Sequence, residues 1–406
     1  MKKILIGLVV FAVAVGGVFA QGWTFNGTVD GGLGLYFLQD QDDPIVAPLT
    51  HSQTDNSFRT TLLTRFTNDD KNVGADFQLR AEGFARFNTD LMAWFDYAYG
   101  WLSFNNSMFV IKGGRVNDTT FSALDRMFGG DNGEGLGLML TVKPVENLYF
   151  GFGAYSNTTE SRKPEDSNSD LSSAPQIGTS DQPQGNFAVS YMMPEVFKVV
   201  AGVSNRTARS KREAITSRDS GVASQTYLSF QYLGVSSLHA ALTARLRNVE
   251  EFSDLGIMNF YVTLGHTGLV DGLDLRLGGS VGLNSVDNSD MHVWAMLGAY
   301  YQATDWLQPR LDAHFVMGGT AGGYNKMQTL HNTYWILTNE TWNKDDMFVQ
   351  LRPAFRFSVS SNASSFFELG GLINIDLGDK DKASGASWGG NHGINSAAYA
   401  SVRVVF

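Results

Sequence analysis

The chain has 406 residues, 44 of them glycine and none of them cysteine, and it carries a net charge of −10. The negative charge argues against a nucleic-acid partner and against attraction to anionic lipids, and the lack of cysteine excludes a disulfide framework. Aromatic residues make up 12% of the chain, and the mean hydropathy is near neutral at −0.12. This composition fits either a soluble all-β protein or a membrane barrel whose apolar residues occupy alternate positions.

The first twenty residues have the pattern of a cleavable secretory signal peptide. Lys2 and Lys3 supply a positive start, the run from Ile4 to Phe19 is almost wholly apolar or small, and cleavage is expected after Ala20. The alternative is an uncleaved N-terminal membrane anchor, which the short run and the good cleavage site disfavour. No later stretch reaches about 18 apolar residues, so we expect no further membrane helix.

Strand signals dominate from Trp23 onward. The clearest example is 73–87, where Phe77 and Leu79 share one face and Asp76 and Arg80 share the opposite one. A strand of this kind needs apolar surroundings on one side and water on the other. The pattern therefore favours a transmembrane barrel over a soluble β protein.

This two-faced pattern recurs along the whole chain, and helical periodicity is nearly absent. We predict an all-β fold, a transmembrane antiparallel up-and-down β-barrel of about 18 strands, with 16 as the alternative. Residues 21–406 form this single barrel in our interpretation. The expected strands lie at 23–37, 57–66, 73–87, 91–104, 108–115, 135–143, 148–157, 185–193, 196–206, 223–232, 237–248, 256–266, 273–284, 291–302, 306–316, 346–358, 365–376 and 395–406.

The expected connections alternate between short turns and longer polar loops. Short ones include Asn68–Asn72, Asn105–Ser107 and Pro144–Asn147, whereas 158–184 and 317–345 are long. An up-and-down barrel with one turn rim and one loop rim produces this alternation, and a soluble sandwich has no reason to follow it. The short exceptions among the loops are 88–90, 249–255 and 285–290.

The last expected strand carries a further signal. Ala400, Val402, Val404 and the terminal Phe406 share one face. This strand resembles the C-terminal signature of outer-membrane barrel proteins, which the barrel assembly machinery reads. The resemblance implies residence in the cell outer membrane, contact with its lipids, and assembly through the strand that ends at Phe406.

The polar faces of the expected strands are rich in arginine. An arginine facing lipid near the midplane would cost about 2–4 kcal/mol, so these side chains are expected inside the barrel. Acidic residues on the same faces (Asp76, Glu82 and Glu368) offer an alternative role, in which the arginines pair with them and brace the wall. The arginines on the first and last strands, which become neighbours on closure, are Arg59, Arg65, Arg80, Arg86, Arg352, Arg356 and Arg403.

The connection at 116–134 is the best candidate for a loop that folds into the barrel and narrows it. It contains Asp118, Asp125 and Asp131 and ends at Glu134. Eighteen strands enclose more space than side chains can fill, and strand patterning begins too early for an N-terminal plug. We therefore expect a pore rather than a filled interior.

An acidic loop in this place and an arginine-lined wall make the chain similar to the general bacterial porins. The resemblance implies that the loop faces the arginines across a constriction, and that a water-filled channel passes small hydrophilic solutes by diffusion. Opposed charges across a narrow aqueous gap order water and favour small polar solutes. The resemblance also implies a homotrimer.

Two other functions stay open, and catalysis is not expected. Aromatic residues in 317–345 fit a substrate-selective channel, for example for sugars, and the long polar loops fit a surface adhesin or structural barrel. None of the seven histidines is followed two places on by serine, as a barrel phospholipase would need. Asp312 and His314 share a face, as a catalytic pair would, but we interpret them as a solvated pair inside the barrel. No spacing suggests a metal or cofactor site.

Overall fold

The computed structural model describes most of the expected barrel. The predicted signal peptide and Phe406 lie outside the described residues. Within the described part of the chain, no helix is long and apolar enough to cross a membrane. The described residues are 22–37, 45–49, 56–84, 91–124, 134–156, 184–205, 224–248, 257–284, 291–317, 347–358, 364–377 and 394–405.

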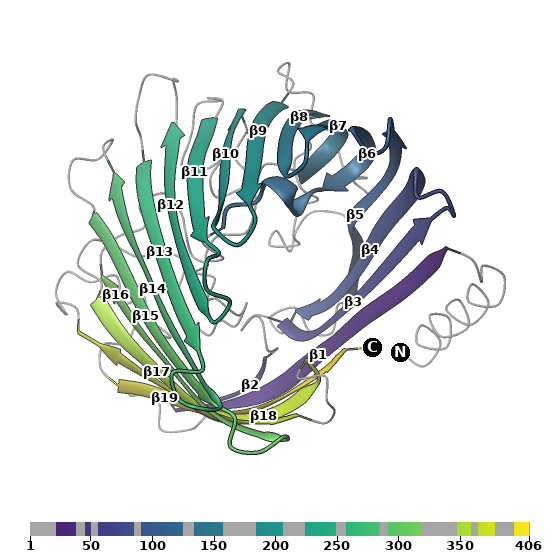
Figure 1. Ribbon diagram of the computed structural model, residues 1–406. Coiled ribbons are helices and arrows are strands. Elements are labelled where there is room, and N and C mark those ends of the chain that lie inside the picture. Colours follow the sequence, from purple (N-terminus) through teal and green to yellow (C-terminus); the bar gives the residue numbers. More distant parts are fainter. Residues whose placement is uncertain are drawn as a thin grey trace.

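Nineteen strands among these described residues form one antiparallel sheet (Figure 1). They are β1 (Trp23–Phe37), β2 (Ile45–Leu49), β3 (Asn56–Thr67), β4 (Val73–Phe84), β5 (Leu91–Phe104), β6 (Phe109–Asn117), β7 (Glu134–Val145), β8 (Leu148–Ser156), β9 (Gln184–Met193), β10 (Phe197–Asn205), β11 (Ser224–Tyr232), β12 (Leu238–Asn248), β13 (Ile257–Thr267), β14 (Leu273–Asn284), β15 (Met291–Tyr301), β16 (Leu307–Met317), β17 (Met347–Ser358), β18 (Phe366–Asp376) and β19 (Ile394–Val405).

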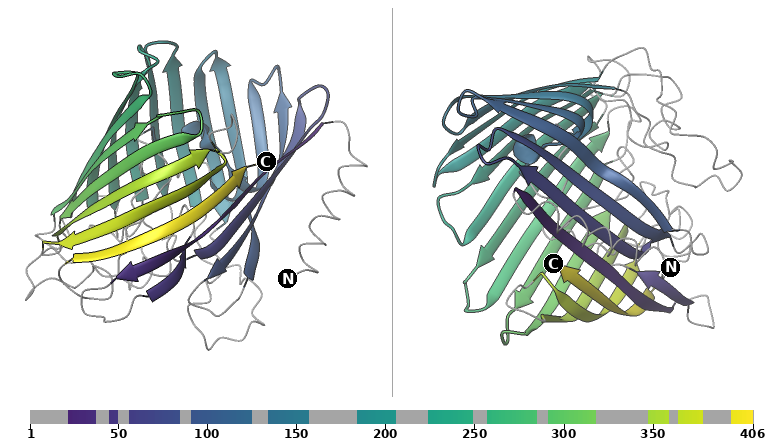
Figure 2. Two further views of the ribbon diagram at one scale, coloured as in Figure 1. Left: turned by 90° about the horizontal axis from the view of Figure 1, so that it is seen from below. Right: turned by 90° about the vertical axis from the view of Figure 1, so that its right-hand side faces the viewer.

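The sheet closes on itself between its first and last strands. Strand β1 pairs with β19 from Thr28↔Val405 to Phe37↔Ser396, and on its other side it pairs with β3. Figures 1 and 2 show the resulting ring and the steep tilt of its strands. The short β2 only adds to β1, so the barrel itself has eighteen strands (nineteen minus β2), which confirms the predicted fold class and count.

Strand β2 is a departure from the sequence interpretation, which treated 38–56 as a loop. Its residues pair with Gly32–Tyr36 of β1 in antiparallel register. Strand β3 pairs with β1 only as far as Gly31, so β2 continues the pairing from there toward the end of β1. The segment Ile-Val-Ala-Pro-Leu is apolar and partly β-branched, which suits a short strand. The first loop thus extends the wall at the loop rim.

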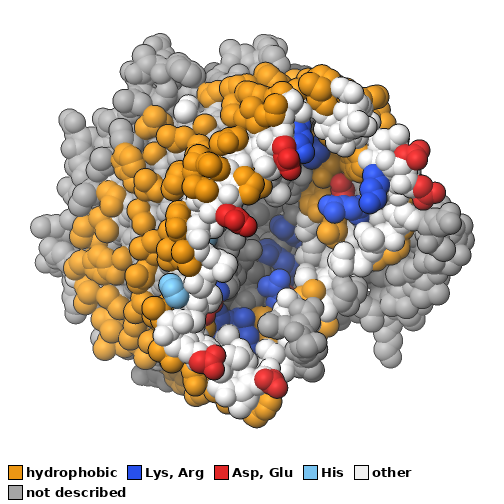
Figure 3. All heavy atoms as spheres, viewed as in Figure 1, with side chains coloured by type: hydrophobic (Ala, Val, Ile, Leu, Met, Phe, Trp, Pro, Cys, Tyr) orange, Lys and Arg blue, Asp and Glu red, His pale blue; other side chains and the backbone are white. Residues whose placement is uncertain are grey.

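Apolar side chains alternate outward and polar ones inward. Leu33, Phe95 and Leu138 are 59%, 54% and 61% exposed on the outer surface, whereas Asp30 and Asp76 are buried on the inner face. Figure 3 shows the hydrophobic side chains spread over the outside, with lysine and arginine around the central hollow. This is the arrangement that lipid outside and water inside require.

Short turns join the strands at the turn rim as predicted, and the departure at Pro144 has a clear physical cause. Left-handed residues tighten several short turns, among them Asn105 (φ 51°) and Asn147 (φ 63°), and asparagine tolerates this conformation well. Strand β7 continues through Pro144 to Val145, although the sequence pattern placed Pro144 in the turn. A register shift between Val142 and Val145 absorbs the proline, which cannot donate to the strand ladder.

Candidate functional site

A single carboxylate on the inner wall binds three arginines. Glu368 of β18 is fully buried, and its Oε2 accepts hydrogen bonds from Arg310 Nη1 at 3.1 Å and from Arg356 Nε at 3.0 Å. Its Oε1 accepts one from Arg352 Nη2 at 2.5 Å. Charge-assisted bonds of this kind are about twice as strong as neutral ones. We refer to Arg310, Arg352, Arg356 and Glu368 as the arginine cluster.

Strand register explains why these side chains meet. Arg356 lies directly opposite Glu368 across β17 and β18, and Asp312 lies opposite Arg352 across β16 and β17. Since side chains alternate along each strand, all of these residues point to the inner face. Directly paired residues on one face have Cβ atoms about 5 Å apart, which is within reach of a guanidinium.

Aromatic rings pack against the guanidinium groups of the cluster. Arg310 lies 4.2 Å from the ring centre of Tyr300, and Arg356 lies 3.7 Å from that of Phe366. Tyr399 accepts a hydrogen bond from Arg352 Nε at 2.7 Å and donates one to Glu368 at 3.0 Å. Cation–π contacts add to the ion pairs and restrict the side chains.

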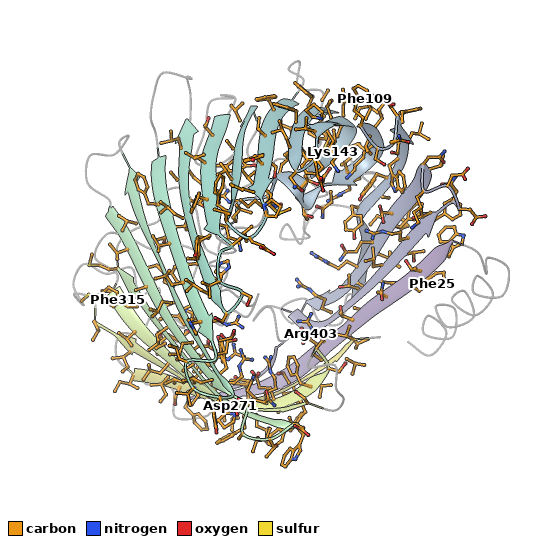
Figure 4. The ribbon with its side chains drawn as sticks, in the orientation of Figure 1. Phe25, Phe109, Lys143, Asp271, Phe315 and Arg403 are labelled. Atoms are coloured by element: carbon orange, nitrogen blue, oxygen red, sulfur yellow. The ribbon has the colours of Figure 1, made fainter. Side chains whose placement is uncertain are left out.

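The cluster keeps a positive excess. Its three arginines face Glu368 and the nearby Asp312, which itself accepts a hydrogen bond from Tyr300. Three positive charges against two negative ones leave one unbalanced positive charge. Arg403 of β19 lies on the same inner face, next to the cluster strands, and Figure 4 shows it at the inside of the wall.

The first strands carry the remaining arginine candidates. Arg65 of β3 forms an ion pair with the buried Asp76 of β4, as the bracing alternative expects. Arg59 and Arg80 are half-buried on the inner faces of β3 and β4. Arg86 lies outside the described residues.

The connection after β6 turns inward and attaches to the far strands. Asp118 caps a 3-10 helix (Thr119–Phe121) by accepting a hydrogen bond from Thr120 N at 2.9 Å. Leu124 N donates to Ser229 Oγ of β11 at 2.8 Å, and the hydroxyl of Tyr227, also in β11, donates to the carbonyl of Phe121. Residues 118–124 therefore lie against the inner wall.

This segment fills one side of the barrel with apolar groups. Phe121 and Leu124 pack with Met139 of β7 and Tyr227 of β11 in a buried hydrophobic cluster that extends from β5 to β12. Phe121 is 0% exposed and Met139 is 1% exposed. The arginine cluster lies outside this apolar side, on strands β16 to β18. Figure 3 shows lysine and arginine side chains around the hollow, and Figure 4 places Arg403 at its edge.

Asp118 is the one acidic candidate whose side chain is among the described residues. Asp118 is buried and accepts a hydrogen bond from Lys112 Nζ of β6 at 2.7 Å, which balances its charge at the wall. Burial alone would raise the pKa of the Asp118 carboxyl, but the Lys112 ammonium and the bonds from Thr120 hold that pKa below its usual value. Asp125 and Asp131 lie outside the described residues, and only the backbone of Glu134 is described.

Sequence reasoning named Glu368 as a partner of the arginines in the bracing alternative, and Glu368 does pair with Arg352 and Arg356. It placed Arg310 on the inner face of its strand without a partner, and it gave no site role to Tyr300 or Tyr399. The tyrosines carried no separate signal, because aromatic residues are common in strands for other reasons.

A closed eighteen-stranded barrel with an apolar outer belt, a charged inner wall and a loop folded against that wall has the fold of an outer-membrane porin, which confirms the expected resemblance at the level of the fold. Solved structures agree. Pseudomonas aeruginosa OccK2 (OpdF), solved in complex with glucuronate, is 11% identical, with 95% of this chain and 99% of that chain covered and a TM-score of 0.55. Pseudomonas aeruginosa OpdL is 10% identical, with 96% and 99% covered and a TM-score of 0.54. No protein-family model matches the chain, and the search of curated proteins finds no match.

Proposed function

We propose that this protein is an outer-membrane channel through which small hydrophilic solutes diffuse, with a preference for anions. It acts without catalysis and without a cofactor. The observation that carries the proposal is the positive excess of the arginine cluster on the inner wall, where Arg310, Arg352 and Arg356 share the single carboxylate of Glu368.

The apolar cluster on the β5–β12 side strengthens this preference. Because apolar groups around Phe121 fill the β5–β12 side, a solute is directed along the wall that bears the cluster and Arg403. A charged wall bordered by low-dielectric material focuses its potential into the remaining gap. The passage of neutral solutes is then limited only by their size, and anions pass more readily than cations.

Planar-bilayer recording of the refolded protein tests the proposal. We expect steady single-channel conductance in KCl, and a reversal potential under a salt gradient whose sign indicates anion preference. Absence of conductance from protein whose folded state is verified by heat-shifted gel mobility would refute the channel. Conductance with cation preference would retain the channel and refute the role of the cluster.

The homotrimer and the reading of Phe406 by the assembly machinery remain predictions from the sequence resemblance. Light scattering of the detergent-solubilised protein measures the oligomeric state, with a trimer expected.

A further inference from the structure

Four polar side chains form a row across the inner wall on the loop side of the arginine cluster. His314 of β16 lies opposite Gln350 of β17, and Gln350 lies opposite Asn374 of β18. Trp294 of β15 stacks on His314, with ring centres 6.0 Å apart and planes at 16°. The row spans about 14 Å across four strands, given the usual spacing of strands in a sheet.

The row holds three buried polar atoms without partners. Trp294 Nε1, His314 Nδ1 and Asn374 Oδ1 have no hydrogen-bond partner among the described residues. All three side chains are at least nine-tenths buried, with exposures of 2%, 6% and 2%. A buried polar group left unpaired costs about 1–3 kcal/mol, so such atoms usually mark a place that something polar occupies.

The donor and acceptor types of these atoms restrict the ligand. Trp294 Nε1 only donates a hydrogen bond, Asn374 Oδ1 only accepts one, and His314 Nδ1 does either according to tautomer. A carboxylate could satisfy only the donors, and an ammonium group only the acceptors. A hydroxyl group both donates and accepts, and a chain of hydroxyls could satisfy all three.

We propose that the row of Trp294, His314, Gln350 and Asn374 is a binding subsite for polyhydroxylated solutes, which they meet before the arginine cluster. The register supports this order, since His314 and Gln350 lie two residues nearer the loop rim than Asp312 and Arg352 on the same strands. The inference rests on the proposed channel function and specifies one class of solute for it.

Solute-induced changes of single-channel current test the subsite, with sorbitol as the probe. Tetraethylene glycol serves as the comparison solute, because it is of similar size but has only two hydroxyl groups. We expect sorbitol to reduce the current in a saturable way, beyond the reduction produced by tetraethylene glycol. Equal effects of the two solutes on a conducting protein would overturn the subsite and leave the channel proposal standing.

Two separate variants locate the effect. Trp294→Phe removes the indole N–H but keeps a ring against His314, and Asn374→Leu removes the acceptor at similar volume. Each should raise the half-maximal sorbitol concentration by roughly 2- to 12-fold, the usual range for loss of one hydrogen bond.

Thr141→Val is the matched control. Thr141 Oγ1 is also buried without a partner among the described residues, but it lies on β7, on the other side of the ring. Its sorbitol response should equal that of the unmodified protein. An unchanged response in both row variants, or an equal loss in Thr141→Val, would overturn the assignment.

Discussion

Glu368 lies directly across the β17–β18 pair from Arg356, and its Oε2 accepts a hydrogen bond from Arg356 Nε at 3.0 Å. The same carboxylate also binds Arg310 and Arg352, so one side chain connects strands β16, β17 and β18 on the inner wall. Glu368 therefore stabilises the contact between these strands and also reduces the positive charge of the inner wall.

Glu368→Gln should destabilise the barrel and increase its anion preference. Three buried arginines lose their common counter-charge, and breaking a buried ion pair from one side usually costs about 3–5 kcal/mol. We expect a lower midpoint in urea unfolding followed by tryptophan fluorescence. Glu146→Gln is the control, because Glu146 is exposed in the short turn between β7 and β8 and should leave the midpoint unchanged.

Simultaneous replacement of Arg59, Arg80 and Arg352 by glutamine should shift ion preference toward cations. The change removes three positive charges from the inner wall, and the reversal potential in a KCl gradient measures the result. Arg115→Gln removes one charge from the outer face of β6 and should leave the potential unchanged. If the triple variant behaves like this control, the three arginines lie away from the narrow part of the path.

Tyr227→Phe combined with Ser229→Ala should loosen the inward segment. The two changes remove the hydrogen bonds that β11 makes to Phe121 and Leu124, together worth about 1–3 kcal/mol. We expect greater open-channel current noise. Ser190→Ala is the control, because Ser190 is also buried on the inner face, and it should keep the noise of the unmodified protein. If the double variant shows no extra noise, other contacts are sufficient to hold residues 118–124 against the wall.

Acidification should weaken the same segment through Asp118. The pKa of this carboxyl is lowered in the folded protein. Its contribution to the stability of residues 118–124 is therefore complete above the usual pKa of about 4, and it is lost as pH falls through the lowered pKa. Open-channel noise should therefore rise only below about pH 4. Asp118→Asn, which cannot pair ionically with Lys112, should be noisy at neutral pH and insensitive to acid. Equal pH profiles for both proteins would refute this role.

The fold was largely predictable because its main constraint is local. Alternation such as that of Phe77 against Asp76 can be recognised within one strand, and the contrast of turns with loops determines the topology. Strand β2 was missed because five apolar residues inside a loop have no alternation long enough to detect. Pro144 was misplaced because the bulge that admits it depends on the neighbouring strand.

The site was less predictable because it depends on register between strands far apart in sequence. Arg310 and Glu368 are 58 residues apart, and nothing local specifies that their side chains meet. Likewise, the pairing of Asp118 with Lys112 depends on how the chain turns after β6. The sequence could assign these side chains to the inner face and offer Glu368 as a partner for arginines, but it could not specify which arginines bind Glu368 or that Lys112 binds Asp118.

The seam between β1 and β19 has a consequence for biogenesis. The first strand to leave the exporting machinery cannot complete its hydrogen bonds until the last strand has been delivered. Until then, both flanks of the growing sheet expose unpaired backbone groups that invite mispairing with other chains. A chain that ended before Ile394 would keep two such edges permanently, so truncation should lead to aggregation and degradation rather than to a smaller pore.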